Sequence, residues 1–138
     1  MDLESQAGVE ERLPLFNSFP DVVAKELPVR IWPDPILHKL SMPIDKEFGT
    51  TELQQLIVDM FHTMRLNKGV GLAAPQVGVS KRVITMEVEP NVLVYFINPI
   101  ITESSDVNYK WEEGCLSVPG YFEFRERPND IKVWTNDI

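Results

Sequence analysis

The fold class of this chain is decided by the stretch TELQQLIVDMFHTM, residues 51–64. Its apolar residues recur at the i, i+3, i+4, i+7 spacing that gathers side chains on one face of a helix. They are Leu53, Leu56, Ile57, Met60, Phe61 and Met64. Thr51 followed by Gln54 has the form of a capping box, which predicts Thr51 as the N-cap. We therefore predict a buried amphipathic helix that ends near Asn67-Lys68-Gly69. Its opposite side, expected to face solvent, carries Gln55, Asp59 and His62.

Beyond this helix the apolar period changes from helical to two. Runs rich in β-branched and aromatic residues alternate with turn residues such as Asn98-Pro99 and Pro128-Asn129-Asp130. They predict five strands, at residues 83–88, 92–97, 107–113, 121–126 and 131–135. One helix followed by consecutive, mostly antiparallel strands is an α+β arrangement, not a βαβ one. The last four residues are expected either to begin a hairpin turn whose returning strand is absent or to end a short edge strand.

The first 28 residues lack periodicity and mix acidic residues with prolines. They predict an N-terminal extension, residues 1–28, that is weakly ordered or wraps a domain formed by residues 29–138. Asp34-Pro35 is expected to open a short turn or helix, because a proline pushes the residue before it out of the helical region. This turn would carry Ile36, Leu37 and Leu40 inward and leave His38 exposed.

Composition excludes several classes of protein. A single cysteine cannot form an internal disulfide, which favours a reducing, cytoplasmic compartment. A formal net charge of -8 argues against direct nucleic-acid binding. The longest apolar run, residues 92–97, is far shorter than the roughly 20 residues that cross a bilayer. The start of the chain lacks the cationic and apolar parts of a signal peptide. We therefore expect an intracellular protein without a membrane segment.

Two stretches carry candidate chemistry. The loop GVGLAAPQ, residues 69–76, formally matches the dinucleotide pattern G-x-G-x-x-G/A. That pattern must leave a strand and open a helix, whereas this loop leaves a helix and Pro75 with Gly78 disfavours another. Residues without Cβ instead let a peptide-like ligand approach the backbone, and the amide of Gln76 can donate to a carbonyl oxygen.

The second stretch is EGCLS, residues 113–117, which contains the only cysteine. Cys115 could be a small buried residue, a nucleophile or a metal ligand. A nucleophilic cysteine needs a base such as histidine within hydrogen-bond reach, and neither His38 nor His62 is well placed. As a metal ligand it needs further donors, because catalytic sites normally use three protein ligands.

Together, the stretches 69–76 and 113–117 resemble the first and second signature motifs of the peptide deformylases. The resemblance runs from about Leu27 to the end of the chain. It implies a metal-dependent hydrolase that removes the formyl group from N-formylmethionine of nascent polypeptides and releases formate. Cys115 would be a thiolate ligand of a divalent metal, Fe(II) with Zn or Ni as substitutes. The Leu116 N–H and the Gln76 side chain would donate to the formyl oxygen as it becomes an oxyanion.

The same resemblance assigns the remaining site residues. Gly69 and Gly71 would lie along the substrate, with Gly71 pairing with its backbone as a strand does. Val70 would help to line the methionine pocket, and Glu113 would support the site from behind. The expected partners are N-formylmethionyl nascent peptides and the ribosome exit region.

The third motif of that family, H-E-x-x-H on a helix, is absent from this sequence. Only 23 residues follow Cys115, and both histidines precede it. One hypothesis is a deformylase whose C-terminal part is not in the sequence, which predicts a less stable protein with an exposed apolar groove. A second is a non-catalytic relative that retains a peptide groove. A third is that His38 or His62 joins Cys115 around a metal.

Overall fold

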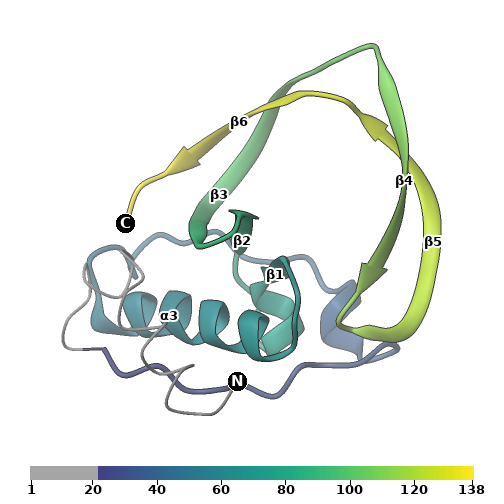
Figure 1. Cartoon of the computed structure of the whole chain (residues 1–138). Coiled ribbons are helices and arrows are strands. Elements are labelled where there is room, and N and C mark those ends of the chain that lie inside the picture. Colours follow the sequence, from purple (N-terminus) through teal and green to yellow (C-terminus); the bar gives the residue numbers. More distant parts are fainter. Residues whose placement is uncertain (1–21) are drawn as a thin grey trace.

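The computed structural model describes residues 22–138, shown as a cartoon in Figure 1. Its elements are the 3-10 helix η1 (Pro35–His38), helix α3 (Thr51–Leu66), strand β1 (Gly71–Ala73), the 3-10 helix η2 (Ala74–Val77), and strands β2 (Val83–Glu89), β3 (Val92–Ser104), β4 (Asn108–Cys115), β5 (Val118–Pro128) and β6 (Ile131–Asn136). An α-helix beside antiparallel strands confirms the predicted α+β class. None of the helices in the described part is long and apolar enough to span a membrane.

Helix α3 packs its apolar face against the sheet and contributes six of the twelve buried apolar residues in the described part of the chain. Ile57, Met60, Phe61 and Met64 are fully buried, whereas Leu56 is only partly buried. The predicted N-cap was wrong by one residue, because the Thr50 hydroxyl accepts the hydrogen bond from Leu53 N–H at 3.3 Å. Thr50 has extended backbone angles while Thr51 is already helical. Two adjacent threonines offer the same side chain, so the sequence could not distinguish them.

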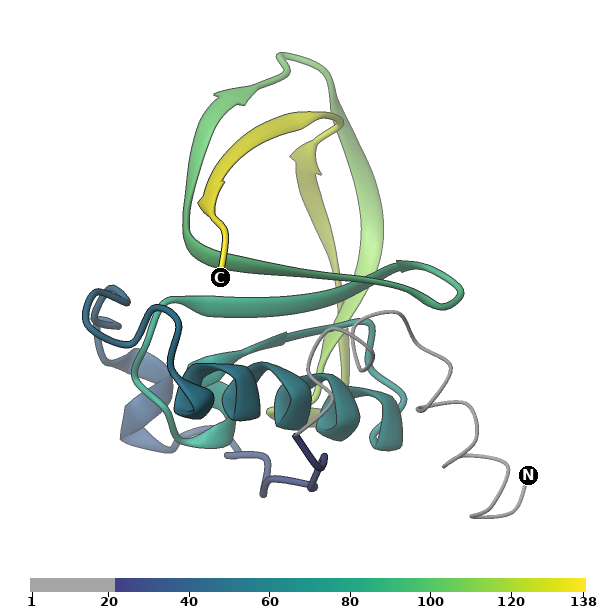
Figure 2. The same cartoon turned by 90° about the vertical axis from the view of Figure 1, so that its left-hand side faces the viewer.

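The sheet lies over helix α3, as Figure 2 shows, with the strand order β1-β2-β3-β6 and antiparallel pairing throughout. The five predicted strands are present, although β3 and β5 are much longer than predicted. Strand β1 was predicted as loop, because its small residues carry no alternating pattern. It forms by pairing with β2, where Leu72 lies opposite Thr85. Pro75 and Gly78 were expected to disfavour a helix, but the short 3-10 helix η2 forms with Pro75 in its first turn and Gly78 as its C-cap at a φ of 88°.

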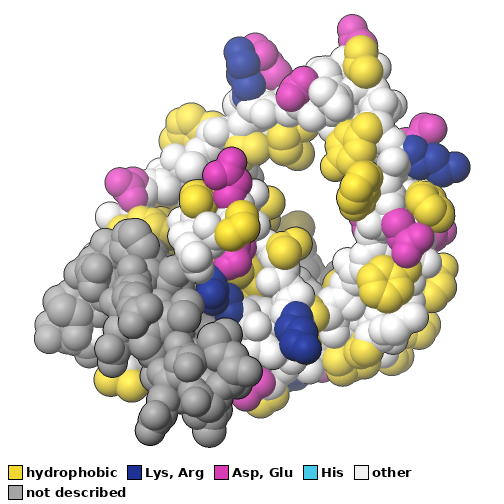
Figure 3. Space-filling model, viewed as in Figure 1, with side chains coloured by type: hydrophobic (Ala, Val, Ile, Leu, Met, Phe, Trp, Pro, Cys, Tyr) yellow, Lys and Arg dark blue, Asp and Glu magenta, His cyan; other side chains and the backbone are white. Residues whose placement is uncertain are grey.

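Strands β4 and β5 form a separate two-stranded sheet that continues the β3–β6 pair. At the bend, Ser105 N–H donates to the Asp130 carbonyl and Asn129 N–H to the Val107 carbonyl, both at 2.8 Å. The result is one long ribbon folded into an arch, which encloses an opening in Figure 3. Exposed large apolar side chains lie on its four strands: Ile100, Ile101, Tyr109, Trp111, Tyr121, Phe122, Phe124, Ile131 and Trp134. The arch therefore carries exposed apolar side chains on strands of both sheets.

The first two of the last four residues belong to strand β6. Strand β6 runs to Asn136, and the Thr135 hydroxyl bonds both the N–H and the carbonyl of Ile97, at 2.9 and 3.1 Å. Ile138 is partly buried against the core. Residues 135 and 136 thus belong to strand β6, which is the last strand of the four-stranded sheet in the described part of the chain.

Two predictions about the N-terminal half were wrong. Leu40 is 78% exposed, because η1 ends at His38 and Lys39 turns the chain into an extended conformation. Asp59 is buried and His62 is partly buried, whereas both were placed on the solvent side of helix α3. The described end of the predicted extension, residues 22–28, lies along this side and covers Asp59. Residues 1–21 of that extension lie outside the described part of the chain.

The position of the N-cap can be tested with two neighbouring variants. Thr50→Ala removes the hydroxyl that accepts from Leu53 N–H and should lower the free energy of unfolding by about 1 kcal/mol. Thr51→Ala, already inside the helix, should change it by no more than about 0.5 kcal/mol. Urea unfolding followed by circular dichroism measures both, and a larger loss for Thr51→Ala would contradict this capping.

Candidate functional site

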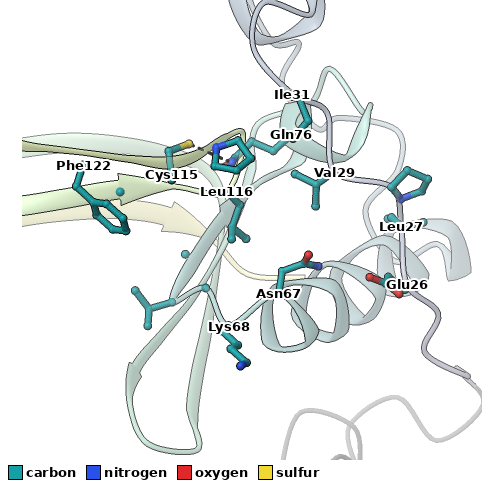
Figure 4. Close-up of a pocket in the computed structure, with 17 residues that line it drawn as sticks. Glu26, Leu27, Val29, Ile31, Asn67, Lys68, Gln76, Cys115, Leu116 and Phe122 are labelled. Carbon is teal, nitrogen blue, oxygen red and sulfur yellow. Dashed lines mark hydrogen bonds between the residues drawn. The ribbon is translucent and has the colours of Figure 1, made fainter.

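The side chain of Gln76 connects the two signature stretches. Its Oε1 accepts a hydrogen bond from Ala73 N–H at 3.0 Å, which fixes the orientation of the amide. Its Nε2 then donates to the Ser117 hydroxyl oxygen at 3.1 Å and points at Cys115 Sγ, 3.6 Å away (Figure 4). The amide therefore presents its donor end to the cysteine.

Cys115 ends strand β4, and Leu116 lies in the turn that leads to β5. The thiol of Cys115 is exposed, whereas the Leu116 side chain packs against the core. A Cβ at Gly69 would lie only 2.7 Å from Leu116 Cδ1, so the first stretch needs a residue without a side chain at this point. The first glycine of the loop thus permits close contact between the two stretches.

These residues line a groove of about 1130 Å³. From the predicted site it contains Gly69, Val70, Gly71, Gln76, Cys115 and Leu116. Gly71 is exposed on β1, and β1 is an edge strand, so one side of its backbone faces away from the sheet. The side chain of Val70 is 71% exposed beside it. The groove thus combines a free strand edge, apolar surface and the amide of Gln76.

Glu113 lies outside the lining of this groove. It borders a smaller depression with Cys115, Arg125 and Arg127, and both its oxygens accept hydrogen bonds from Arg127, at 2.8 and 3.1 Å. The hydrogen bond from Arg127 lowers the pKa of Glu113 below its ordinary value, and the same contact raises the pKa of Arg127. Sequence reasoning missed Arg127, because strand pairing sets it opposite Tyr109 and Glu113 opposite Glu123, and the contact forms only where the long Arg127 side chain reaches Glu113.

Sequence reasoning also missed the segment that forms another wall of the groove. Glu26, Leu27, Pro28, Val29 and Ile31 all line it. Arg30 N–H donates to the Gln76 carbonyl at 2.7 Å and Trp32 N–H to the Ser117 carbonyl at 2.8 Å. Part of this segment belongs to the extension to which no chemistry was assigned. The hydrogen bonds that hold it are made by the backbone N–H groups of alternate residues, so no side-chain pattern in the sequence predicts them.

The residues described do not form a complete metal site. Within residues 22–138, no group of three or more His, Cys, Asp and Glu side chains could hold a metal ion. His38 lies on η1 and His62 on α3, and neither lines the groove. The hypothesis that one of them joins Cys115 in a metal site therefore gains no support from the structure.

Comparison with known proteins agrees with this geometry. Residues 26–138 match the family model described as polypeptide deformylase. The chain is 45% identical over 105 residues to the peptide deformylase of Maricaulis maris, covering 73% of this chain and 59% of that protein. It is 46% identical over 104 residues to peptide deformylase 1 of Burkholderia multivorans, covering 74% and 56%. The chain thus spans less than two thirds of the length of these relatives.

Solved structures show the same likeness. The peptide deformylase of Thermotoga maritima superposes with a TM-score of 0.77 at 41% identity, covering 82% of this chain and 75% of that one. A class I type b peptide deformylase from Acinetobacter baumannii, bound to Met-Ala-Ser, gives 0.76 at 39% identity, covering 80% and 76%. The α+β fold with this groove is therefore the fold of a peptide deformylase. The chain belongs to the peptide deformylase family.

The contact between Gly69 and Leu116 can be tested with a double-mutant cycle. Gly69→Ala should destabilise the protein by about 1–3 kcal/mol, because the new Cβ displaces the Leu116 side chain. Leu116→Ala makes room for that Cβ. The double variant should therefore be more stable than the sum of the single changes predicts, by about 1 kcal/mol. Urea unfolding of the four proteins measures this coupling, and simple additivity would show that the two residues do not meet.

The ion pair of Glu113 predicts how stability depends on pH. Since the pKa of Glu113 is lowered in the folded state, the pair stabilises the protein above the ordinary value of 4.5. That contribution is lost as the pH falls below 4.5 through the folded-state pKa. Arg127→Met should raise the pKa of Glu113 in a carboxyl NMR titration and reduce the loss of stability on acidification. Lys132→Met, which removes an equal charge from the separate Lys132–Glu103 pair, should leave the Glu113 titration unchanged.

Proposed function

We propose that the groove binds the formylmethionyl end of a peptide, and that the chain serves the hydrolytic removal of the formyl group with release of formate. The observation that carries this proposal is the fixed amide of Gln76. Its Oε1 is held by Ala73, so its Nε2 stays directed toward Cys115 and the groove. A donor held in this way matches an oxygen of a bound formyl group.

The walls of the groove favour a peptide as its occupant. Gly71 lies on the edge strand β1, where an extended peptide can add its own backbone hydrogen bonds. Val70 places an apolar side chain beside that edge, as a methionine side chain requires. The Acinetobacter baumannii relative that binds Met-Ala-Ser supports the same class of ligand.

In the proposed reaction, attack on the formyl carbon places negative charge on the formyl oxygen. The Nε2 of Gln76 and the N–H of Leu116 are the donors we assign to that oxygen. Gln76 Nε2 carries two hydrogens, so it can keep its bond to Ser117 while it donates to the ligand. Donors that are already in position when charge develops lower the barrier without reorganisation.

The proposed cofactor is a divalent metal held by Cys115, Fe(II) with Zn or Ni as alternatives. When bound, such a metal would supply a water of lowered pKa for hydrolysis. Residues 22–138 provide Cys115 but no cluster that completes a site. The further ligands and the general acid/base would have to come from outside these residues. Glu113, held by Arg127 behind the cysteine, is proposed to steady the backbone of β4 at this ligand.

A second candidate function is a module that binds peptides and performs no hydrolysis. Such a module would need the groove but no metal cluster, and none is found within residues 22–138. In either function the proposed partners are formylmethionyl nascent peptides and the ribosome exit region. The single cysteine and the acidic composition support a cytoplasmic setting.

Titration with formyl-Met-Ala-Ser and with Met-Ala-Ser, together with a formate assay after anaerobic loading with Fe(II), tests both candidates. We expect the formylated peptide to bind more tightly. Gln76→Glu keeps the shape and the contact with Ala73 but replaces the donor, so it should weaken binding of the formylated peptide by about tenfold and that of Met-Ala-Ser much less.

Binding with formate release would establish hydrolysis, and binding without it would favour the binding module. Absence of binding for both peptides would exclude both functions. Cys115→Ser is the control, because it should abolish formate release and leave the peptide groove in place.

A further inference from the structure

Three polar side chains on helix α3 hold the extended segment 22–32, which we call the strap. Gln55 Nε2 donates to the Val23 carbonyl at 2.8 Å. Lys25 N–H donates to Asp59 Oδ1 at 2.9 Å, and Leu27 N–H donates to Thr63 Oγ1 at 2.8 Å. Gln55 Nε2 also donates to Asp59 Oδ1 at 2.7 Å, so these two side chains are hydrogen-bonded to each other.

The spacing of these contacts matches two regular geometries. Gln55, Asp59 and Thr63 are four residues apart, which separates them by about 6 Å along a helix. Their partners on the strap are two residues apart, and an extended chain advances about 6.6 Å over that distance. The polar row on the helix therefore fixes the register of the strap. Asp59 is only 2% exposed and Thr63 is fully buried, so each is enclosed where it makes these bonds.

The strap leads from this polar row directly to the groove. From Glu26 onward it forms a wall of the groove, and its Arg30 and Trp32 amides donate to the carbonyls of Gln76 and Ser117. Figure 4 shows Glu26, Leu27, Val29 and Ile31 of the strap along one side of the site. Four residues after Thr63 comes Asn67, the C-cap of helix α3, which itself lines the groove. The polar row and the groove are thus joined through both the strap and the helix.

We propose that Thr63, with Asp59 and Gln55, is a positioning residue for peptide binding. It does not line the groove. It acts through the strap, whose register sets the wall that faces the peptide. This inference rests on the proposed peptide-binding function of the groove. It implies that residues on the side of helix α3 that the sequence predicted to face solvent affect the affinity for peptide.

A matched pair of variants at Thr63 tests the proposal. Thr63→Val keeps the shape but removes the acceptor of Leu27 N–H, whereas Thr63→Ser keeps the acceptor. Amide hydrogen exchange and titration with formyl-Met-Ala-Ser are measured on wild type and both variants. In Thr63→Val we expect exchange at Lys25 and Leu27 to be about tenfold faster, exchange in β1 and β2 to be unchanged, and peptide affinity to be about tenfold lower. Thr63→Ser should restore affinity to within about threefold of wild type.

A second measurement needs no variant. If strap order favours peptide binding, bound peptide must slow exchange in the strap, because the coupling between two equilibria is reciprocal. Slower exchange at Lys25 and Leu27 in saturated wild type supports the proposal. Two results would overturn the positioning role of Thr63 and leave the proposed function intact. In the first, wild type binds peptide with no change in strap exchange. In the second, Thr63→Val loosens the strap and binds peptide as well as wild type does. Wild type that binds no peptide overturns both.

Discussion

The side-chain amide of Gln76 holds together two parts of the molecule that share no strand pairing. Ala73 fixes one end of the amide within the helix-bearing part, and the other end bonds Ser117 in the turn of the β4–β5 hairpin. Leu116 adds a packed side chain at the same junction, and the bond from Trp32 N–H to the Ser117 carbonyl adds a third connection. The candidate site lies at this junction. The contacts that orient the donor of the site are therefore also the contacts that anchor the hairpin.

This dependence matters because the arch has little else to stabilise it. Almost every residue of β4 and β5 is exposed, so these strands rely on their ladder, on cross-strand pairs and on their anchors at each end. Gly114 allows the Phe122 ring to lie against the opposite strand, since a Cβ there would come within 2.6 Å of it. Segments with few buried contacts open locally at low free energy. Covering the apolar faces of the arch would stabilise the hairpin and, through Ser117 and Leu116, the groove.

The parts of the structure that the sequence predicted are those where periodicity is strong. The apolar face of helix α3 and the positions of the five longer strands follow from spacing alone. The stretch 69–76 carries no such pattern, and β1 exists only because β2 pairs with it. For Asp59 the sequence pattern gave a wrong prediction, because a charged residue on the polar side of a helix is expected to be exposed. Its burial depends on the strap, which bonds it through a backbone amide that any residue could provide. The contact between Arg127 and Glu113 was also missed, because strand pairing sets Arg127 opposite Tyr109 and its long side chain reaches Glu113 from there.

The residues that form the groove are held in place by contacts that do not involve a metal. The strand edge at Gly71, the amide of Gln76 and the strap are fixed by contacts within residues 22–138. A metal site cannot be completed from those residues, where Cys115 has no cluster of donors around it. Since the amide of Gln76 is oriented by Ala73 and Ser117, its direction does not depend on a metal at Cys115. The residues that we propose for peptide recognition are therefore positioned within residues 22–138, whereas the proposed hydrolysis would need further groups.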